Sequence, residues 1–165
     1  MQRTLSRTGT IVMLALVACL VLGVAAVDAG AETSANVGNT ASDAGAKITR
    51  RAQMLELINA KRDARGIAKL DASPRVRRYS HHHSRVMAHR GYLFHTASLA
   101  KQLKGIHWSI AGENVGSGGD VDVLFDAFMD SAPHRKNILR ASFRRVGIGI
   151  VQRDGSLWVT MVFYG

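Results

Sequence analysis

Hydrophobic positions follow the period of an amphipathic helix over residues 48–65, ITRRAQMLELINAKRDAR, and polar side chains fill the opposite face. Gly66 comes directly afterwards, and a glycine after the last helical turn is a common C-cap. The pattern therefore predicts a helix that is closed by Gly66. Its buried face is expected to contain Ile48, Met54, Leu55, Leu57 and Ile58.

A second helix is predicted over residues 70–91, LDASPRVRRYSHHHSRVMAHRG. Ser73 is suited to the N-cap, and Pro74 is tolerated in the first turn because an N–H there would have no intrahelical partner. Gly91 is expected to end the helix. The predicted inner face comprises Val76, Tyr79, Ser80, His83, Val86 and Met87.

The middle of the chain shows a mixed pattern. Residues 105–115, GIHWSIAGENV, predict a strand or extended segment that leads into a glycine-rich loop. A third helix is predicted over residues 120–130 with Asp120 as its N-cap, and residues 131–139, SAPHRKNIL, predict a short helical turn that begins at Ser131. The third helix should bury Val121, Leu124, Phe125 and Phe128 and expose Asp122, Asp126 and Asp130.

The C-terminal residues 146–165 form two β-rich runs on either side of Arg153-Asp154-Gly155. An Asp-Gly pair between two such runs predicts a β-hairpin. Helices therefore come first and an antiparallel hairpin ends the chain, which predicts the α+β fold class.

Residues 1–31 have the three parts of a secretory signal peptide. Arg3 and Arg7 form a basic head, residues 11–27 form an uncharged apolar run, and Ala29-Gly30-Ala31 offers a small-residue cleavage site. Two alternatives remain, an uncleaved membrane anchor through residues 11–27 and lipidation at Cys19, which ends the sequence LVAC. Secretion is the preferred interpretation.

Residues 32–46, ETSANVGNTASDAGA, are small and polar without periodic apolar positions, which is typical of a flexible linker. Residues 47–165 then suit one domain with one core. Cys19 is the single cysteine of the chain and would leave with the signal peptide. The exported domain should therefore lack disulfide bonds and depend on a packed core.

The chain has a net charge of +10, from 22 Lys and Arg residues against 12 Asp and Glu residues. An exported basic protein is attracted to anionic envelope polymers and lipid headgroups, which are the partners that the charge favours. No DNA- or RNA-binding motif is present, so specific nucleic-acid binding is not expected. We expect a monomer.

Common catalytic motifs give little support for an enzyme. HExxH and GxSxG are missing, and Ser98–Lys101, SLAK, matches S-x-x-K without the accompanying S-D-N and K-T-G motifs. The triplet at residues 81–83 cannot converge on one ion, because successive helical side chains point about 100° apart. His83 is expected in the core, whereas His81, His82 and His89 are expected on the surface.

Three ionisable residues interrupt stretches that otherwise look buried: His95 in YLFHT, Glu113 in AGENV and His134 in SAPHRKNIL. A half-buried carboxylate needs a hydrogen-bond or charge partner. Histidine is a partner whose protonation such a carboxylate would tune. The three residues are far apart in the sequence, so only tertiary structure can bring them together.

The order of LFHT, AGENV, SAPHRKNIL, VGIGIV and WVTMVFYG resembles a bacterial domain of the CAP superfamily, also called the SCP domain. This family contains cysteine-rich secretory proteins, antigen 5 and pathogenesis-related 1 proteins. The resemblance covers about residues 50–165. It implies an α-β-α sandwich with an antiparallel sheet between two helical layers.

The resemblance also implies a cleft lined by two histidines and acidic residues. His95 and His134 match the cleft histidines, which hold Zn²⁺ or Mg²⁺ in some members, and Glu113 matches the glutamate of the GEN motif. Many members have a second cleft glutamate after a tryptophan of the third helix. Here Phe128 and Ser131 occupy those two positions, which puts in doubt any mechanism that needs two carboxylates.

The leading functional hypothesis is an exported module of the cell envelope or extracellular space that binds an unidentified ligand in this cleft. One alternative is a metal-assisted hydrolase in which Glu113 acts as base on a metal-bound water. Another is a protein that binds lipid between apolar helices. A purely structural role for the three residues, as a buried hydrogen-bonded network, is also open.

Overall fold

The computed structural model describes residues 49–165. The predicted signal peptide or anchor (residues 1–31), the linker (residues 32–46), Cys19 and Ile48 lie outside the described residues. The elements in chain order are α1 (Arg50–Asp63), β1 (Asp71–Ala72), α2 (Pro74–Arg90), α3 (Leu99–Gln102), β2 (Ala111–Gly118), α4 (Val121–Asp130), α5 (Ala132–Ile138), β3 (Arg145–Arg153) and β4 (Ser156–Tyr164). In residues 49–165, no helix combines the length and the hydropathy that crossing a bilayer requires.

The four strands form one sheet in the order β1-β3-β4-β2. β3 and β4 form the predicted antiparallel hairpin, and β2 pairs antiparallel with the other side of β4. Asp154 and Gly155 at the hairpin turn both have positive φ, 49° and 77°. A two-residue turn with two positive φ values matches the twist of the flanking strands, which explains the Asp-Gly sequence.

One strand changes the expected sheet. β1 pairs parallel with β3, so the sheet is mixed and not wholly antiparallel. The pairing is short, and the backbone hydrogen bonds that flank it include Asp71 N–H to Arg144 O and Ser73 N–H to Val146 O. Two residues carry no periodic pattern, which is why the sequence did not indicate this strand.

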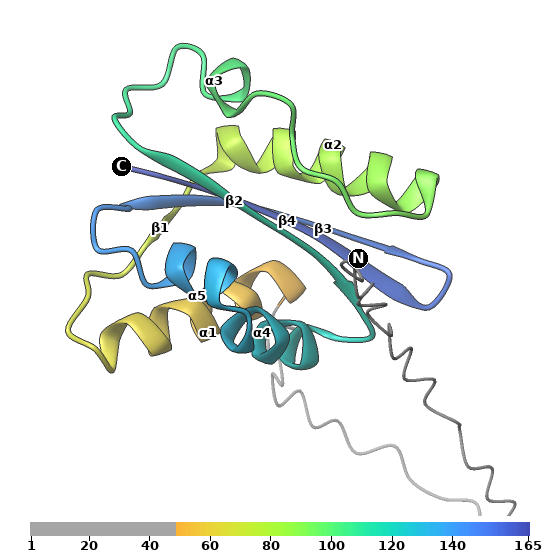
Figure 1. Cartoon of the computed structure of the whole chain (residues 1–165), viewed down its shortest axis with the longest axis horizontal. Helices are drawn as coiled ribbons and strands as arrows, with labels where there is room; N and C mark the ends of the chain where they lie inside the picture. The colour runs from red at the N-terminus through yellow and green to blue at the C-terminus, as the bar shows by residue number, and fades with distance from the viewer. Residues whose placement is uncertain (1–48) are drawn as a thin grey trace, which may run out of the picture. The chain divides into compact units, whose positions relative to one another are not determined.

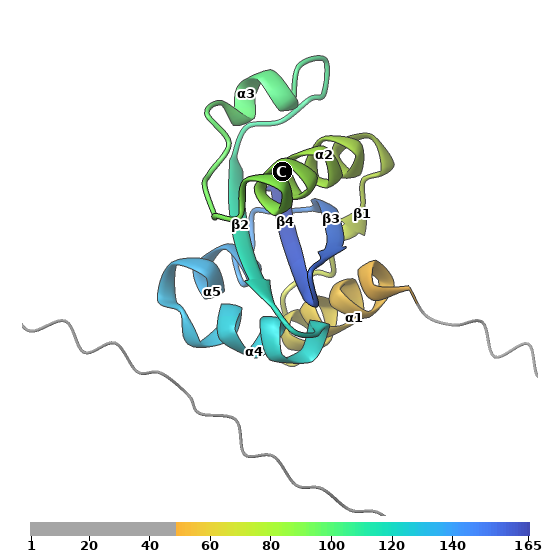
Figure 2. The same ribbon diagram turned by 90° about the vertical axis from the view of Figure 1, so that its right-hand side faces the viewer.

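Helices cover both faces of the sheet in residues 49–165, as the sandwich expectation required. α2 and α3 lie on one side, and α1, α4 and α5 lie on the other (Figure 1). The view along the sheet separates the three layers clearly (Figure 2). The α+β class and the sandwich architecture are therefore confirmed.

α2 packs unusually close to β3 because two glycines of VGIGIV face it. A Cβ on Gly149 would lie 2.2 Å from the backbone of Ser80 and His81, and one on Gly147 would lie 2.6 Å from Val76. The small Ser80 and Ser84 side chains then donate hydrogen bonds to Gly147 O (2.8 Å) and Gly149 O (3.0 Å). Serine on the helix and glycine on the strand thus act as one packing unit.

The opposite layer contains the larger apolar cluster, in which α1 and α4 cover the sheet with side chains that include Met54, Ile58, Phe125 and Phe128. Arg62 is fully buried at the edge of this cluster. Its guanidinium donates to the carbonyls of Ala68, Ile138, Arg140 and Phe143. Burial, with a smaller effect of nearby Arg144, lowers the pKa of Arg62. Four carbonyl acceptors compensate for the buried charge.

The predicted helices need two corrections. α1 ends at Asp63 with Ala64 as its C-cap, and Gly66 (φ 64°) lies in the turn that follows. Tyr79 was assigned to the inner face of α2, but its side chain is exposed. Ser84, which was not assigned, is buried there instead, because its hydroxyl bonds to Gly149 O and Thr160 Oγ1.

The glycine-rich segment is strand and not loop. The strand predicted over residues 105–115 begins only at Ala111, which confirms Gly112 and Glu113 as strand residues, and it continues through Gly116 and Gly118, which were predicted to lie in a loop. A Cβ on Gly116 would lie 2.7 Å from the Phe128 ring, and one on Gly118 would lie 3.0 Å from Leu124. The glycines leave room for α4 against the sheet, so here they indicate close packing and not a turn.

Candidate functional site

β2 places Glu113 next to the segment between α2 and α3. Gly112 and Gly116 face the α4 and α5 layer. Side chains alternate along a strand, so Glu113 points to the other side. Its side chain is 4% exposed, although it carries a carboxylate. Burial of this kind requires specific donors.

His95 supplies the first donor. Its Nδ1 lies 2.8 Å from Glu113 Oε1, and the His95 side chain is 62% exposed. A carboxylate oxygen accepts, so Nδ1 carries the proton and the neutral ring keeps its lone pair on Nε2. The backbone N–H of Thr96 donates to the same Oε1 at 2.9 Å. Glu113 therefore orients His95 and determines which ring nitrogen is free.

The second carboxylate oxygen of Glu113 has no such support. Glu113 Oε2 is buried and makes no hydrogen bond with any residue in 49–165. A nearby amide shows the same feature, since Gln102 Nε2 donates to Thr96 Oγ1 at 2.7 Å while Gln102 Oε1 is buried without a partner. Unsatisfied buried acceptors are rare, so these two oxygens mark a polar region that its own side chains leave incomplete.

His134 comes from α5, which begins after Ser131. Its ring lies edge-on to Phe128 with ring centroids 5.2 Å apart. Burial lowers the pKa of His134, and repulsion from the His95 ring, when that ring is protonated, lowers it further. The two histidines therefore influence each other electrostatically, and His134 is held in the neutral form near pH 7.

Two asparagines that the sequence pattern did not single out connect His134 to Glu113. Asn114 Nδ2 donates to His134 O at 3.0 Å. Asn137 Nδ2 donates to Asn114 Oδ1 (2.8 Å) and to Glu113 O (3.2 Å). Asn114 is fully buried. A polar residue next to Glu113 in an otherwise apolar strand was the signal that could have identified it.

Ser131 and Ser98, the two other residues considered for the site, both lie at the start of helices. Ser131 is the N-cap residue of α5, and its side chain makes no capping hydrogen bond. In the described part of the chain no hydrogen bond joins it to His95, Glu113 or His134. Ser98 of the SLAK motif caps α3 by accepting from Lys101 N–H at 3.4 Å. Ser98 therefore acts as a helix cap, and the bond involves the backbone of Lys101 and not its side chain.

The remaining histidines follow the expectations. His83 is buried, its Nε2 lies 2.8 Å from Phe94 O, and its ring is edge-on to Phe94. His81, His82 and His89 are exposed on α2.

The arrangement has the parts of a weak metal site. His95 Nε2 and a neutral His134 are the nitrogen donors available to an ion, and a carboxylate behind a metal-binding histidine raises its basicity. Within residues 49–165 no group of three or more His, Cys, Asp or Glu side chains could surround an ion. Two imidazoles would supply only two ligands, and an ion would need its other ligands from outside these side chains.

A cavity of about 280 Å³ lies elsewhere in the fold. It lies between the start of α1, β1, the start of α2 and β3, and its lining includes Leu55, Pro74 and Ile148. None of His95, Glu113, Ser131 and His134 lines it. The candidate site residues and this cavity therefore lie in different parts of the domain.

Comparison with known families gives a match that covers most of the described residues. The model of the cysteine-rich secretory protein family, CAP, matches residues 55–163. The matched range contains His95, Glu113, Ser131 and His134.

Individual relatives agree with this match. The Bacillus subtilis (strain 168) protein YkwD, whose function is uncharacterised, is 31% identical over 82% of this chain. The chain spans only 55% of that relative.

Solved structures show the same fold. An extracellular SCP-domain protein from Bacillus anthracis has a TM-score of 0.61 at 24% identity, covering 68% of this chain and 39% of its own. A cysteine-rich secretory protein from Staphylococcus aureus has a TM-score of 0.60 at 22% identity, covering 70% and 38%.

Proposed function

The chain belongs to the cysteine-rich secretory protein (CAP) family, and from this we propose that it is an exported binding module whose ligand site is formed by His95, Glu113 and His134. The observation that carries the proposal is the oriented His95–Glu113 pair, with Nδ1 and Oε1 2.8 Å apart. It presents the exposed imidazole of His95, from the segment between α2 and α3, which is anchored to Glu113 of strand β2. A site on rigid elements is held in place before a ligand arrives.

Export is the second part of the proposal. It is supported by the signal-like residues 1–31 and by the names of the two structural neighbours, one called extracellular and the other secretory. The charge of +10 would favour anionic material outside the cell.

A divalent metal is the ligand that the nitrogen donors suit best. His95 and His134 would hold Zn²⁺, and Glu113 would act through its hydrogen bond to His95 instead of binding the ion. When bound, zinc would supply Lewis acidity and an open coordination position. The protein's own residues provide the rest: Glu113 fixes the His95 tautomer, and Phe128 limits water on one side of His134.

The two alternatives gain nothing from the geometry. A hydrolase would need Glu113 as a base at the reacting water, but the Glu113 side chain is only 4% exposed and its Oε1 is occupied by His95 and Thr96. A lipid site between helices would use the cavity beside α1, which is remote from these residues. We therefore retain the binding module.

Calorimetric titration with zinc tests this proposal. We expect one binding site in the parent protein and loss of that site in His95→Ala and in His134→Ala. His107→Ala is the matched control, because His107 is exposed and has no hydrogen-bond partner in the described residues. Circular dichroism should show that all variants are folded.

Glu113→Gln separates orientation from coordination. The amide keeps the shape but cannot enforce the Nδ1–H tautomer of His95 as a carboxylate does. Loss of such a supporting carboxylate typically weakens metal binding by about 10–100-fold. Unchanged zinc affinity in all four variants, or the absence of binding in the parent, would assign the three residues a structural role.

A further inference from the structure

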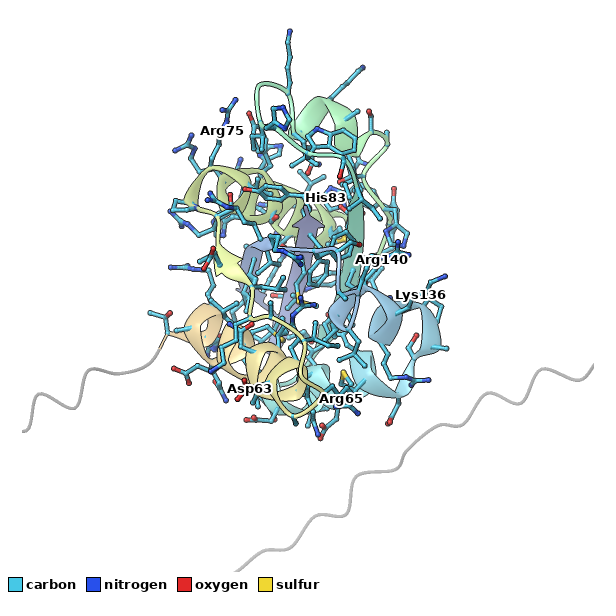
Figure 3. The ribbon with its side chains drawn as sticks, turned by 90° about the vertical axis from the view of Figure 1, so that its left-hand side faces the viewer. Asp63, Arg65, Arg75, His83, Lys136 and Arg140 are labelled. Atoms are coloured by element: carbon cyan, nitrogen blue, oxygen red, sulfur yellow. The ribbon has the colours of Figure 1, made fainter. Side chains whose placement is uncertain are left out.

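The layer formed by α2, α3 and their connections contains no acidic residue. Between Asp71 and Glu113 the sequence has no Asp or Glu. The same stretch contains Arg75, Arg77, Arg78, Arg85, Arg90, Lys101 and Lys104. Most acids of the described residues lie in the other helical layer, including the α4 stripe of Asp122, Asp126 and Asp130. Arg75 marks the basic layer, and Asp63 and Arg65 lie on the far side of the sheet (Figure 3).

The outer face of α2 carries a stripe in which two arginines alternate with two histidines. Arg78, His82, Arg85 and His89 are all exposed and follow helical spacing, opposite the buried Ser80 and Ser84. Arg153, at the end of β3, donates to His89 Nδ1 at 2.7 Å and also pairs with Asp154 at 3.2 Å, so both charges lie at this end of the stripe. Among residues 49–165 no carboxylate forms an ion pair with Arg78 or Arg85.

Exposed apolar side chains border the same stripe. Tyr79 (41% exposed), Tyr92 (54%) and Leu93 (46%) are three of the four exposed large hydrophobic residues of the described chain. Tyr79 lies on α2, and Tyr92 and Leu93 follow its C-cap directly. Phe94 holds this connection against the helix, with its ring 5.1 Å from the Arg90 guanidinium. The connection that carries Tyr92 and Leu93 is thus anchored at the C-terminal end of α2, beside Arg90, which follows His89 of the stripe directly.

The combination points to a specific partner chemistry. A soluble polyanion would need only the positive charge. Tyrosine and leucine beside arginine are instead what a bilayer interface accommodates, because the apolar side chains enter the headgroup region while the cations contact anionic lipids. The exposed residues therefore favour a membrane surface over a polymer.

We propose that the α2 face, defined as Arg78, His82, Arg85 and His89 with Tyr79, Tyr92 and Leu93, docks the domain onto an anionic phospholipid bilayer. The contact is peripheral and does not span the membrane. It uses none of the residues assigned to the ligand site, so it stands whether or not that site binds metal.

Co-sedimentation with vesicles tests the docking surface. The full chain is mixed with vesicles of phosphatidylcholine alone or of phosphatidylcholine with phosphatidylglycerol, and the readout is the ratio of the two partition coefficients. Residues 11–27 are present in every sample, so any contact they make with lipid contributes to both vesicle types. We expect a clear preference for the anionic vesicles that declines as salt is raised.

Paired variants locate the contact. Arg78→Gln/Arg85→Gln should lower the anionic preference by roughly tenfold or more, since each basic residue near such a surface contributes substantially. Arg65→Gln/Lys136→Gln removes the same charge from the opposite layer (Figure 3) and should change the preference far less. An equal loss in both variants would overturn the proposal, because net charge alone would then explain binding.

The apolar part has its own test. Tyr92→Ser/Leu93→Ser keeps the charge and should weaken binding to anionic vesicles while leaving binding to soluble polyphosphate unchanged. Equal binding of the parent to neutral and anionic vesicles would refute docking. Binding to polyphosphate without any preference for anionic vesicles would also refute it and would identify the face as a polymer site. Circular dichroism of each variant excludes unfolding as the cause.

Discussion

At the scale of single residues, two hydrogen-bond donors stabilise the buried carboxylate of Glu113. His95 Nδ1–H and Thr96 N–H both reach Oε1, while Oε2 is buried without a partner in residues 49–165. Removing both donors from such a carboxylate would leave a buried charge, which is costly. The pair is thus stable only as a unit, and its exposed member is the imidazole.

His134 predicts a dependence of stability on pH. Burial first, and the charge of His95 second, lower its pKa in the folded protein below the ordinary value of 6.5. The unfolded chain therefore takes up a proton more readily than the folded one as the pH falls below 6.5. The stability that His134 contributes should be complete above that pH. It should be lost progressively as the pH falls from 6.5 through the folded pKa.

Denaturant unfolding at a series of pH values measures this effect. His134→Gln cannot titrate and should show a smaller decline than the parent over the same pH window. His107→Gln, on an exposed position, should keep the parent's decline. Identical slopes for His134→Gln and the parent would show that other groups cause the dependence.

At the scale of elements, glycine determines how closely the helices approach the sheet. Gly147 and Gly149 face α2, and Gly116 and Gly118 face α4, so each helical layer packs on a glycine pair. The site depends on this packing, because β2 carries Glu113 and α4 carries Phe128, which contacts His134. A change in either helix-to-sheet distance would separate the ionisable residues.

Gly149→Ala should therefore destabilise the domain. Its Cβ would lie 2.2 Å from backbone atoms of α2, which cannot move aside as a flexible side chain can. Overpacking of this kind costs about 1–3 kcal/mol of unfolding free energy. Gly119→Ala is the control, because its Cβ would meet nothing within 4 Å. Chemical denaturation of both variants measures the difference, and equal stabilities would contradict the packing argument.

At the scale of the whole molecule, the N-terminal residues decide where the domain works. If residues 1–31 act as a cleaved signal, the exported protein should begin at Glu32, after Ala29-Gly30-Ala31. Intact mass measurement of protein recovered from the culture medium of an expressing bacterium tests this. A membrane-bound product that retains residues 11–27 would identify an anchor, and a lipid mass on Cys19 would identify lipidation.

The local pattern was a good guide to most elements and a poor one to β2. The caps Ser73 and Asp120, the inner face of α4 and the Asp-Gly hairpin were all predicted correctly, because each depends on neighbours within a few residues. Gly116 and Gly118 of β2 were assigned to a loop, because what requires glycine there is close contact with Phe128 and Leu124 from another element.

The sequence by itself determined the class of fold, the family resemblance and the three ionisable residues that stand out from their surroundings. Periodicity, capping and turn chemistry are local properties, and motif order is visible without coordinates. Only the tertiary structure decided that His95 and Glu113 share a hydrogen bond, that Asn114 and Asn137 tie α5 to β2, and that β1 joins the sheet in parallel. These facts depend on distances between segments that are remote along the chain, and spacing in sequence carries no information about such distances.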